Sequence, residues 1–83
     1  MNTSGHVTVM GRVARVRRNS GGWRVRLTDT GGTLAAAEIR PFSHVVLPRV
    51  GARIIIHGRL RYDDQHGWYT IDPVEAWREA SEP

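Results

Sequence analysis

The chain has 83 residues and no cysteine. The absence of cysteine excludes disulfides and thiolate metal sites. The length predicts one domain with a thin core, since a chain of this size buries only roughly 60% of its unfolded surface. No stretch resembles a signal peptide or is apolar enough to span a membrane, so we expect a cytoplasmic protein. All twelve cations are arginine, and they are unevenly placed: residues 1–62 carry eleven against Asp29 and Glu38 (+9), and residues 63–83 carry one against six acids (−5). Such a basic body attracts polyanions, of which nucleic acid is the commonest in a cell.

The first half of the chain is expected to form three strands, because apolar and polar residues alternate with period two. In residues 6–18 the alternation changes phase between Gly11 and Ala14, which predicts a β-bulge. Turn-forming residues at 19–22 and 29–32 then separate a second strand over 23–29 from a third over 33–39.

The segment 50–63 has the clearest alternation and is expected to be the strand on which the others depend. Its core face and its cationic face are separate, and Ile55 is the one apolar residue on the cationic face. Gly58 predicts a bend or a close backbone approach in mid-strand. The residues of the core face are Ile54, Ile56, Gly58, Leu60 and Tyr62, and those of the cationic face are Arg53, His57, Arg59 and Arg61.

Two short helices are expected beside the strands. A single helical turn capped by Ser43 and ended by Pro48 would link the third strand to the fourth. After a fifth strand over 68–72, the run Asp72-Pro73-Val74-Glu75 has the chemistry of a helix start. It predicts a C-terminal helix over about residues 73–80.

Five strands with a helical link after the third resemble the OB-fold. The segments that carry this resemblance are Gly11-Arg12-Val13 and Gly51-x-x-Ile54-x-Ile56-x-Gly58-x-Leu60, which are similar to strand signatures of OB-fold nucleic-acid-binding domains. Single-stranded-DNA-binding proteins and anticodon-binding domains belong to that superfamily. The resemblance covers about residues 6–72 and implies an all-β, five-stranded Greek-key barrel. It also implies a ligand across the second and third strands, flanked by the loops 19–22 and 63–67.

Arginines at outward positions are the candidate phosphate ligands. The planar guanidinium donates two parallel hydrogen bonds to phosphate and also stacks on bases. Arg24 and Arg26 on the second strand come first, and Arg15, Arg17, Arg59 and Arg61 would extend the surface on neighbouring strands. The alternative is a solvated exterior that pairs with the acidic C-terminal third, since a wet face needs charge for solubility.

Aromatic rings are the second requirement for binding single strands. Tyr62 is expected at the barrel mouth, and Trp23, which shares a face with Val25 and Leu27, is expected in the core. Trp68 and Tyr69 point to opposite sides of one strand, so one is expected in the core and the other exposed; parity does not say which. The candidates for stacking are Trp23, Phe42, Tyr62, Trp68 and Tyr69.

The predicted function is binding of single-stranded DNA or RNA with little sequence preference. We expect no cofactor, no metal and no enzyme activity, because no phosphate-binding or nucleophile motif occurs and the cluster Asp63, Asp64, His66, with His57 nearby, is explained by a polar turn. The alternative is a protein-interaction module that does not contact nucleic acid. The acidic C-terminal third would then bind a protein partner, or it would compete in cis for the basic face.

Overall fold

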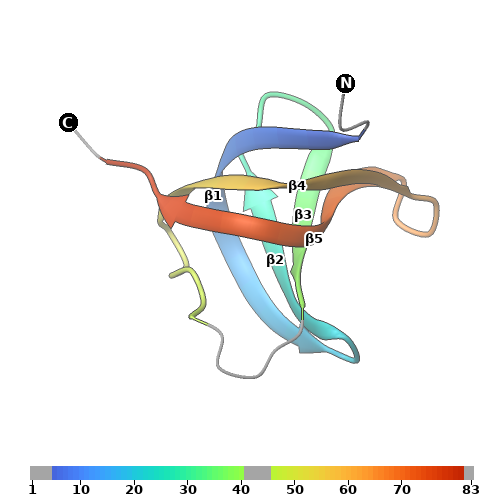
Figure 1. Ribbon diagram of the computed structural model, residues 1–83, viewed down its shortest axis with the longest axis horizontal. Helices are drawn as coiled ribbons and strands as arrows, with labels where there is room; N and C mark the ends of the chain where they lie inside the picture. The colour runs from blue at the N-terminus through green and yellow to red at the C-terminus, as the bar shows by residue number, and fades with distance from the viewer. Residues whose placement is uncertain (1–4, 41–45, 82–83) are drawn as a thin grey trace.

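The computed structural model describes residues 5–40 and 46–81, and within these ranges the chain forms five strands and no helix (Figure 1). The strands close into a barrel in the order β1-β2-β3-β5-β4, with β4 returning to β1. β3 and β5 are parallel, and every other pair is antiparallel. The five strands are β1 (His6–Asn19), β2 (Gly22–Thr28), β3 (Leu34–Ile39), β4 (Arg53–Asp63) and β5 (Trp68–Glu79).

β1 contributes to both sides of the barrel and bends in mid-course (Figure 1). Residues 6–12 pair with β4, and residues 12–19 pair with β2. The β1–β2 register shifts between Val13 and Arg15, which confirms the predicted bulge and leaves Ala14 as the additional, exposed residue. Because of this bulge the outward residues change parity along β1, so that Arg15 and Arg17 face solvent beside β2.

The core lies inside the barrel and comes from the inward faces of all five strands. β4 supplies two isoleucines, as its alternation predicts. Gly58 also behaves as predicted: the β4–β5 register shifts on either side of it, and a Cβ there would overlap the Pro73 carbonyl oxygen and the Ile71 side chain. The buried cluster consists of Val13, Val25, Leu27, Ala37, Ile39, Ile54, Ile56 and Ile71.

The predicted C-terminal helix is wrong. Residues 73–79 continue β5 and pair with β4 from Gly58–Val74 to Ile54–Glu79. A five-residue fifth strand would have left one edge of β4 over residues 54–58 without backbone partners, and unpaired backbone groups cost more than a helix cap contributes. The extended strand also places Val74 and Trp77 against the core.

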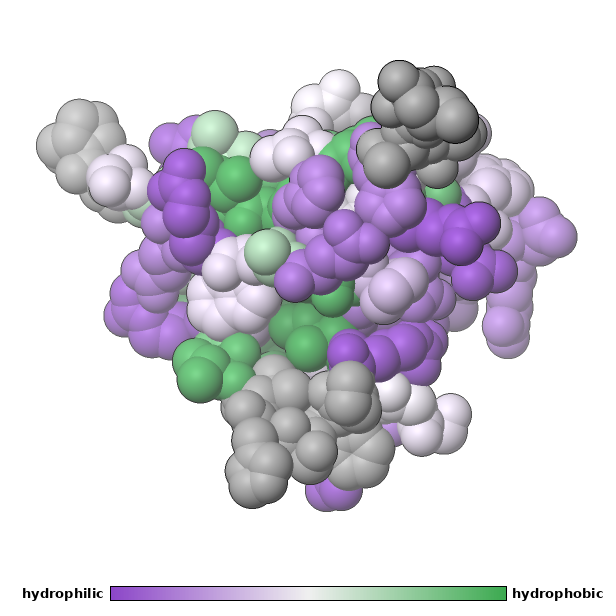
Figure 2. Space-filling view, in the orientation of Figure 1, coloured by the Kyte–Doolittle hydropathy of each residue, from purple (hydrophilic) through white to green (hydrophobic). Residues whose placement is uncertain are grey.

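The predicted link helix is not found in the part of it that the structure describes. Residues 46–48 are not helical, and Ser43 lies outside the described residues. Figure 2 shows the side of the barrel on which β5 lies in front, where hydrophilic side chains surround small apolar areas. No helix in the described ranges has the length and apolar character needed to cross a membrane.

Candidate nucleic-acid interface

Four arginines form a two-by-two array on the outer face of β1 and β2. Arg15 lies opposite Arg26, and Arg17 lies opposite Arg24, in consecutive outward rungs of the ladder. Like charges directly opposite each other destabilise a sheet. The opposition of like charges therefore does not itself stabilise the barrel, and its chemistry fits a surface that meets an anion.

Arg15 and Arg17 are the exposed half of this array. Among the described residues, no acid lies within ion-pair distance of either guanidinium. Both side chains can therefore turn toward a ligand without breaking a contact within the protein.

Arg24, one of the two foremost candidate phosphate ligands, is bound by Glu38, a partner that the sequence did not indicate. Its Nε donates to Oε2 of Glu38 across the β2–β3 ladder at 2.5 Å, and the Glu38 side chain is only 4% exposed. Asn19 donates its amide to Oε1 of Glu38 at 2.8 Å. Glu38 is the one acid among the apolar residues of β3, which could have indicated a buried, paired carboxylate. The residue with which it pairs depends on the β2–β3 register.

Arg40 extends this polar cluster beyond the end of β3. Its Nη2 lies 3.7 Å from Glu38, and its Nε donates to Asp72 at 2.9 Å. The hydrogen bond to Asp72 raises the pKa of the Arg40 guanidinium above its usual value. Since Arg24 and Arg40 are both neutralised by acids, this end of the face offers phosphate less charge than the sequence indicates.

Arg26 stacks on Trp68 of β5. The guanidinium carbon lies 4.3 Å from the ring centroid, and the His66 ring stacks on the same indole at 4.6 Å with an interplanar angle of 6°. Trp68 is therefore half-buried on the outer face and not part of the core cluster. Its ring already has stacking partners within the chain.

Tyr62 and Tyr69 are the exposed rings of the β4–β5 hairpin. They lie opposite each other in the ladder and pack edge to face with centroids 5.1 Å apart. Tyr62 is 56% exposed and Tyr69 39%. Tyr69, and not Trp68, is thus the more exposed of the two neighbouring rings.

Arg61 joins the candidate interface from β4, whereas Arg59 does not. Arg61 is exposed, lies opposite Thr70, and lines an open hollow of about 320 Å³ together with Arg24 and Asp72. Arg59 lies opposite His6 on the β1–β4 side of the barrel. Trp23 is half-buried against the core, and Phe42 lies outside the described residues.

The loop between β4 and β5 is organised by Asp63. Its carboxylate accepts hydrogen bonds from the backbone of Gln65 and His66, and from Nδ1 of the His66 ring at 2.8 Å. The His66 hydrogen bond lowers the pKa of Asp63. In the described part of the chain, no group of three or more His, Cys, Asp or Glu side chains is arranged to hold a metal ion.

No acid in residues 63–81 makes an ion pair with an arginine of the array, although Trp68 stacks on Arg26 and Asp63, Asp64 and Asp72 line a hollow with Arg24. Three acids of this segment pair with residues outside it: Asp72 with Arg40, Glu79 with Arg49, and Glu75 with His6.

No family model matches this chain, and no curated protein matches it. The candidate interface therefore rests on the geometry of the barrel.

Proposed function

We propose that this chain is an OB-fold barrel that binds single-stranded nucleic acid on the outer face of β1 and β2, with little sequence preference. The strand order, with β3 parallel to β5 and a bulged β1 shared by both sides, supports the OB-fold. The observation that carries the function is the like-charged rung Arg15–Arg26 together with the neighbouring Arg17, three arginines with no acid partner among the described residues. A polyanion relieves the repulsion between these guanidinium groups.

Within the proposed site, the arginines and the tyrosines would have different roles. Arg15 and Arg17 would contact phosphates directly, because they are exposed and have no acid partner among the described residues. Arg26 would act together with the Trp68 ring, and Arg61 would extend the cationic path at the hairpin. Tyr62 and Tyr69 would provide the stacking surface, each stacked base being worth about 1–3 kcal/mol.

The test is binding of fluorescein-labelled oligo(dT) and oligo(rU) over a salt series. Arg15→Glu with Arg17→Glu is expected to weaken binding at least about tenfold and to reduce the log–log salt slope by about 1.4, since each phosphate on a single strand contributes about 0.7. The matched control is Arg53→Glu with Arg78→Glu, which changes the charge equally on another face. Equal losses in the two variants, or no binding by the wild type at low salt, would contradict the proposal.

A further inference from the structure

The outer wall formed by β1, β4 and β5 carries a second surface, which we call the Ile55 face. Met10 on β1, Ile55 on β4 and Arg78 on β5 lie side by side in one rung, and Arg12 and Arg53 lie opposite each other in a neighbouring outward rung. Met10 is 42% exposed. An aliphatic centre is thus bordered by three guanidinium groups.

Only one of the three arginines of this face is matched by an acid of the described ranges. Arg53 contacts the Met10 sulfur at 3.2 Å, and neither Arg53 nor Arg78 has an acid partner among the described residues. Arg12 donates to the Gly51 carbonyl at 2.7 Å, and its Nε lies 3.9 Å from the exposed carboxylate of Asp29. Arg53 has no such partner among the described residues, so the opposed Arg12–Arg53 pair keeps a positive charge that an anion would relieve.

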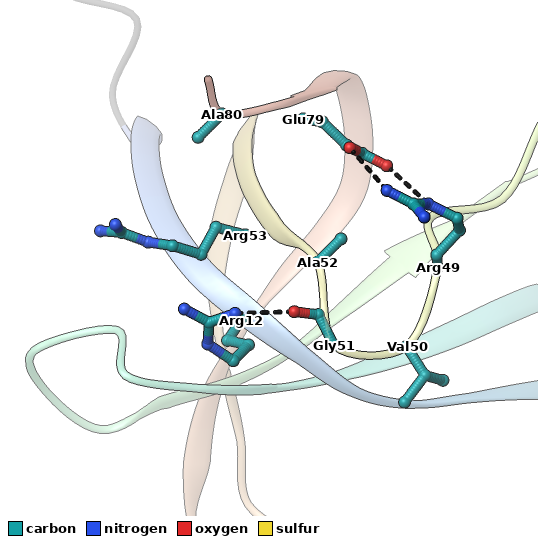
Figure 3. A pocket seen from close by; sticks show the side chains of 8 residues that line it. All are labelled: Arg12, Arg49, Val50, Gly51, Ala52, Arg53, Glu79 and Ala80. Atoms are coloured by element: carbon teal, nitrogen blue, oxygen red, sulfur yellow. Dashed lines mark hydrogen bonds and ion pairs between the residues drawn. The ribbon is translucent and has the colours of Figure 1, made fainter. Parts of the chain in front are cut away.

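Two hollows lie on this wall. The first, of about 430 Å³, is lined by Arg12 and Arg53 on one side and by Arg49 and Glu79 on the other (Figure 3). Arg49 and Glu79 bind each other through two hydrogen bonds of 3.0 Å, so Glu79 does not neutralise the other two arginines. Figure 3 shows the Arg12 and Arg53 side chains extending to the same side, away from that pair.

The second hollow has a mixed lining. It measures about 280 Å³; Ile55, Ala76 and Trp77 form its apolar part, and Thr8, His57 and Arg78 form its polar part. Met10 is an adaptable side chain and Ile55 a more rigid aliphatic one, and peptide side chains pack well on such a surface. Bases need exposed rings for stacking. The two rings at this hollow are engaged within the chain, since Trp77 packs against the core and His57 contacts Thr8 and Glu75, and the exposed tyrosines belong to the β4–β5 hairpin.

We propose that the Ile55 face docks an extended acidic peptide segment of a partner protein. Its carboxylates bind Arg12 and Arg53, with Arg78 nearby, in the bidentate geometry that arginine favours. An apolar side chain of the same segment fills the hollow beside Ile55. Since Arg53 and Ile55 are two residues apart on a strand, about 6.6 Å, the apolar residue of the segment lies about two positions from the nearest acid.

The probe is a fluorescein-labelled peptide, Gly-Asp-Glu-Asp-Gly-Leu-Leu-Gly, whose binding is followed by anisotropy. Two control peptides replace the acids by their amides or the leucines by glycine. Binding is expected for the first peptide only, and Arg53→Glu with Arg78→Glu is expected to weaken it at least about tenfold. Ile55→Thr is expected to remove the preference for leucine over glycine.

The matched control is Arg15→Glu with Arg17→Glu, which should leave peptide binding within about twofold, because these residues lie on the other face. Circular dichroism and thermal unfolding of each variant show whether the barrel is intact. Equal weakening by both double variants, equal binding of all three peptides, or no binding of the acidic leucine peptide would overturn the proposal. So would loss of oligo(dT) binding in the Arg53, Arg78 variant alone, which would assign the Ile55 face to nucleic acid. Loss of oligo(dT) binding in the Arg15, Arg17 variant tests the other face separately.

Discussion

Glu38 joins side chains from three separate segments. It accepts hydrogen bonds from Asn19 at the end of β1 and from Arg24 on β2, and it lies 3.7 Å from Arg40 beyond β3. A buried carboxylate is tolerated only when it is paired and hydrogen-bonded. This one residue therefore sets how much of the cationic face is available to a ligand.

Glu38→Gln is expected to lower the free energy of unfolding by about 2–3 kcal/mol, less than for a fully buried pair, because the Arg24 side chain is 31% exposed. The same change frees Arg24, so oligo(dT) binding is expected to strengthen and its salt slope to steepen. Urea unfolding and the salt series measure the two effects. Asp29→Asn is the control, since this exposed acid contributes less than about 0.5 kcal/mol. An oligonucleotide affinity that falls together with stability would contradict this role.

Arg24 also shows what sequence alone could not provide. Its outward direction follows from the alternation in β2 and was predicted correctly. Its partner follows from the β2–β3 register, which pairs it with Glu38 and which no local pattern specifies. The position of a guanidinium on a face could thus be predicted, but not whether it was already neutralised.

β5 illustrates the same limit for a whole strand. The five strands, the β1 bulge and the close approach at Gly58 were predictable, because each has a local signature of parity or of a glycine. The capping residues Asp72 and Pro73 are equally local and gave the wrong prediction. The outcome depended on the unpaired backbone of β4, which is a long-range requirement.

Gly58→Ala tests the close approach of β4 and β5 at Gly58. A Cβ at this position overlaps the Pro73 carbonyl oxygen and the Ile71 side chain, so stability is expected to fall by about 3 kcal/mol. Gly32→Ala is the control, because nothing lies within 4 Å of its Cβ position. Thermal and urea unfolding measure both variants. Near-equal stabilities of the two variants would show that β4 and β5 pack less closely at Gly58 than described.

The β4–β5 hairpin should also respond to acid. Hydrogen bonding to His66 lowers the pKa of Asp63 in the folded state. Its contribution to stability is therefore present above the ordinary aspartate pKa, about 3.9, and is lost as the pH falls through the lower folded value. Wild type is expected to exceed Asp63→Asn in stability at neutral pH and to lose that advantage in strong acid. Unfolding curves at a series of pH values measure it, and a constant difference would exclude this carboxylate as the cause.

The whole barrel distributes its charge in a way that composition does not reveal. The acids of the C-terminal third pair with Arg40, Arg49 and His6, and among the described residues they make no ion pair with an arginine of the β1–β2 array or of the Ile55 face. Two separate cationic surfaces result. The sequence predicted the imbalance of charge, but the separation arises only when the barrel closes.

The bulge at Ala14 makes this separation possible. Ahead of it, even-numbered residues such as Arg12 face outward beside β4; after it, odd-numbered residues such as Arg15 and Arg17 face outward beside β2. If Ala14 were paired as an ordinary strand residue, the alternation would continue without a break and both guanidinium groups would face the isoleucines. Deleting Ala14 is expected to keep Arg15 and Arg17 outward and to remove only the local bend, so their outward position depends on the irregular pairing at this one residue.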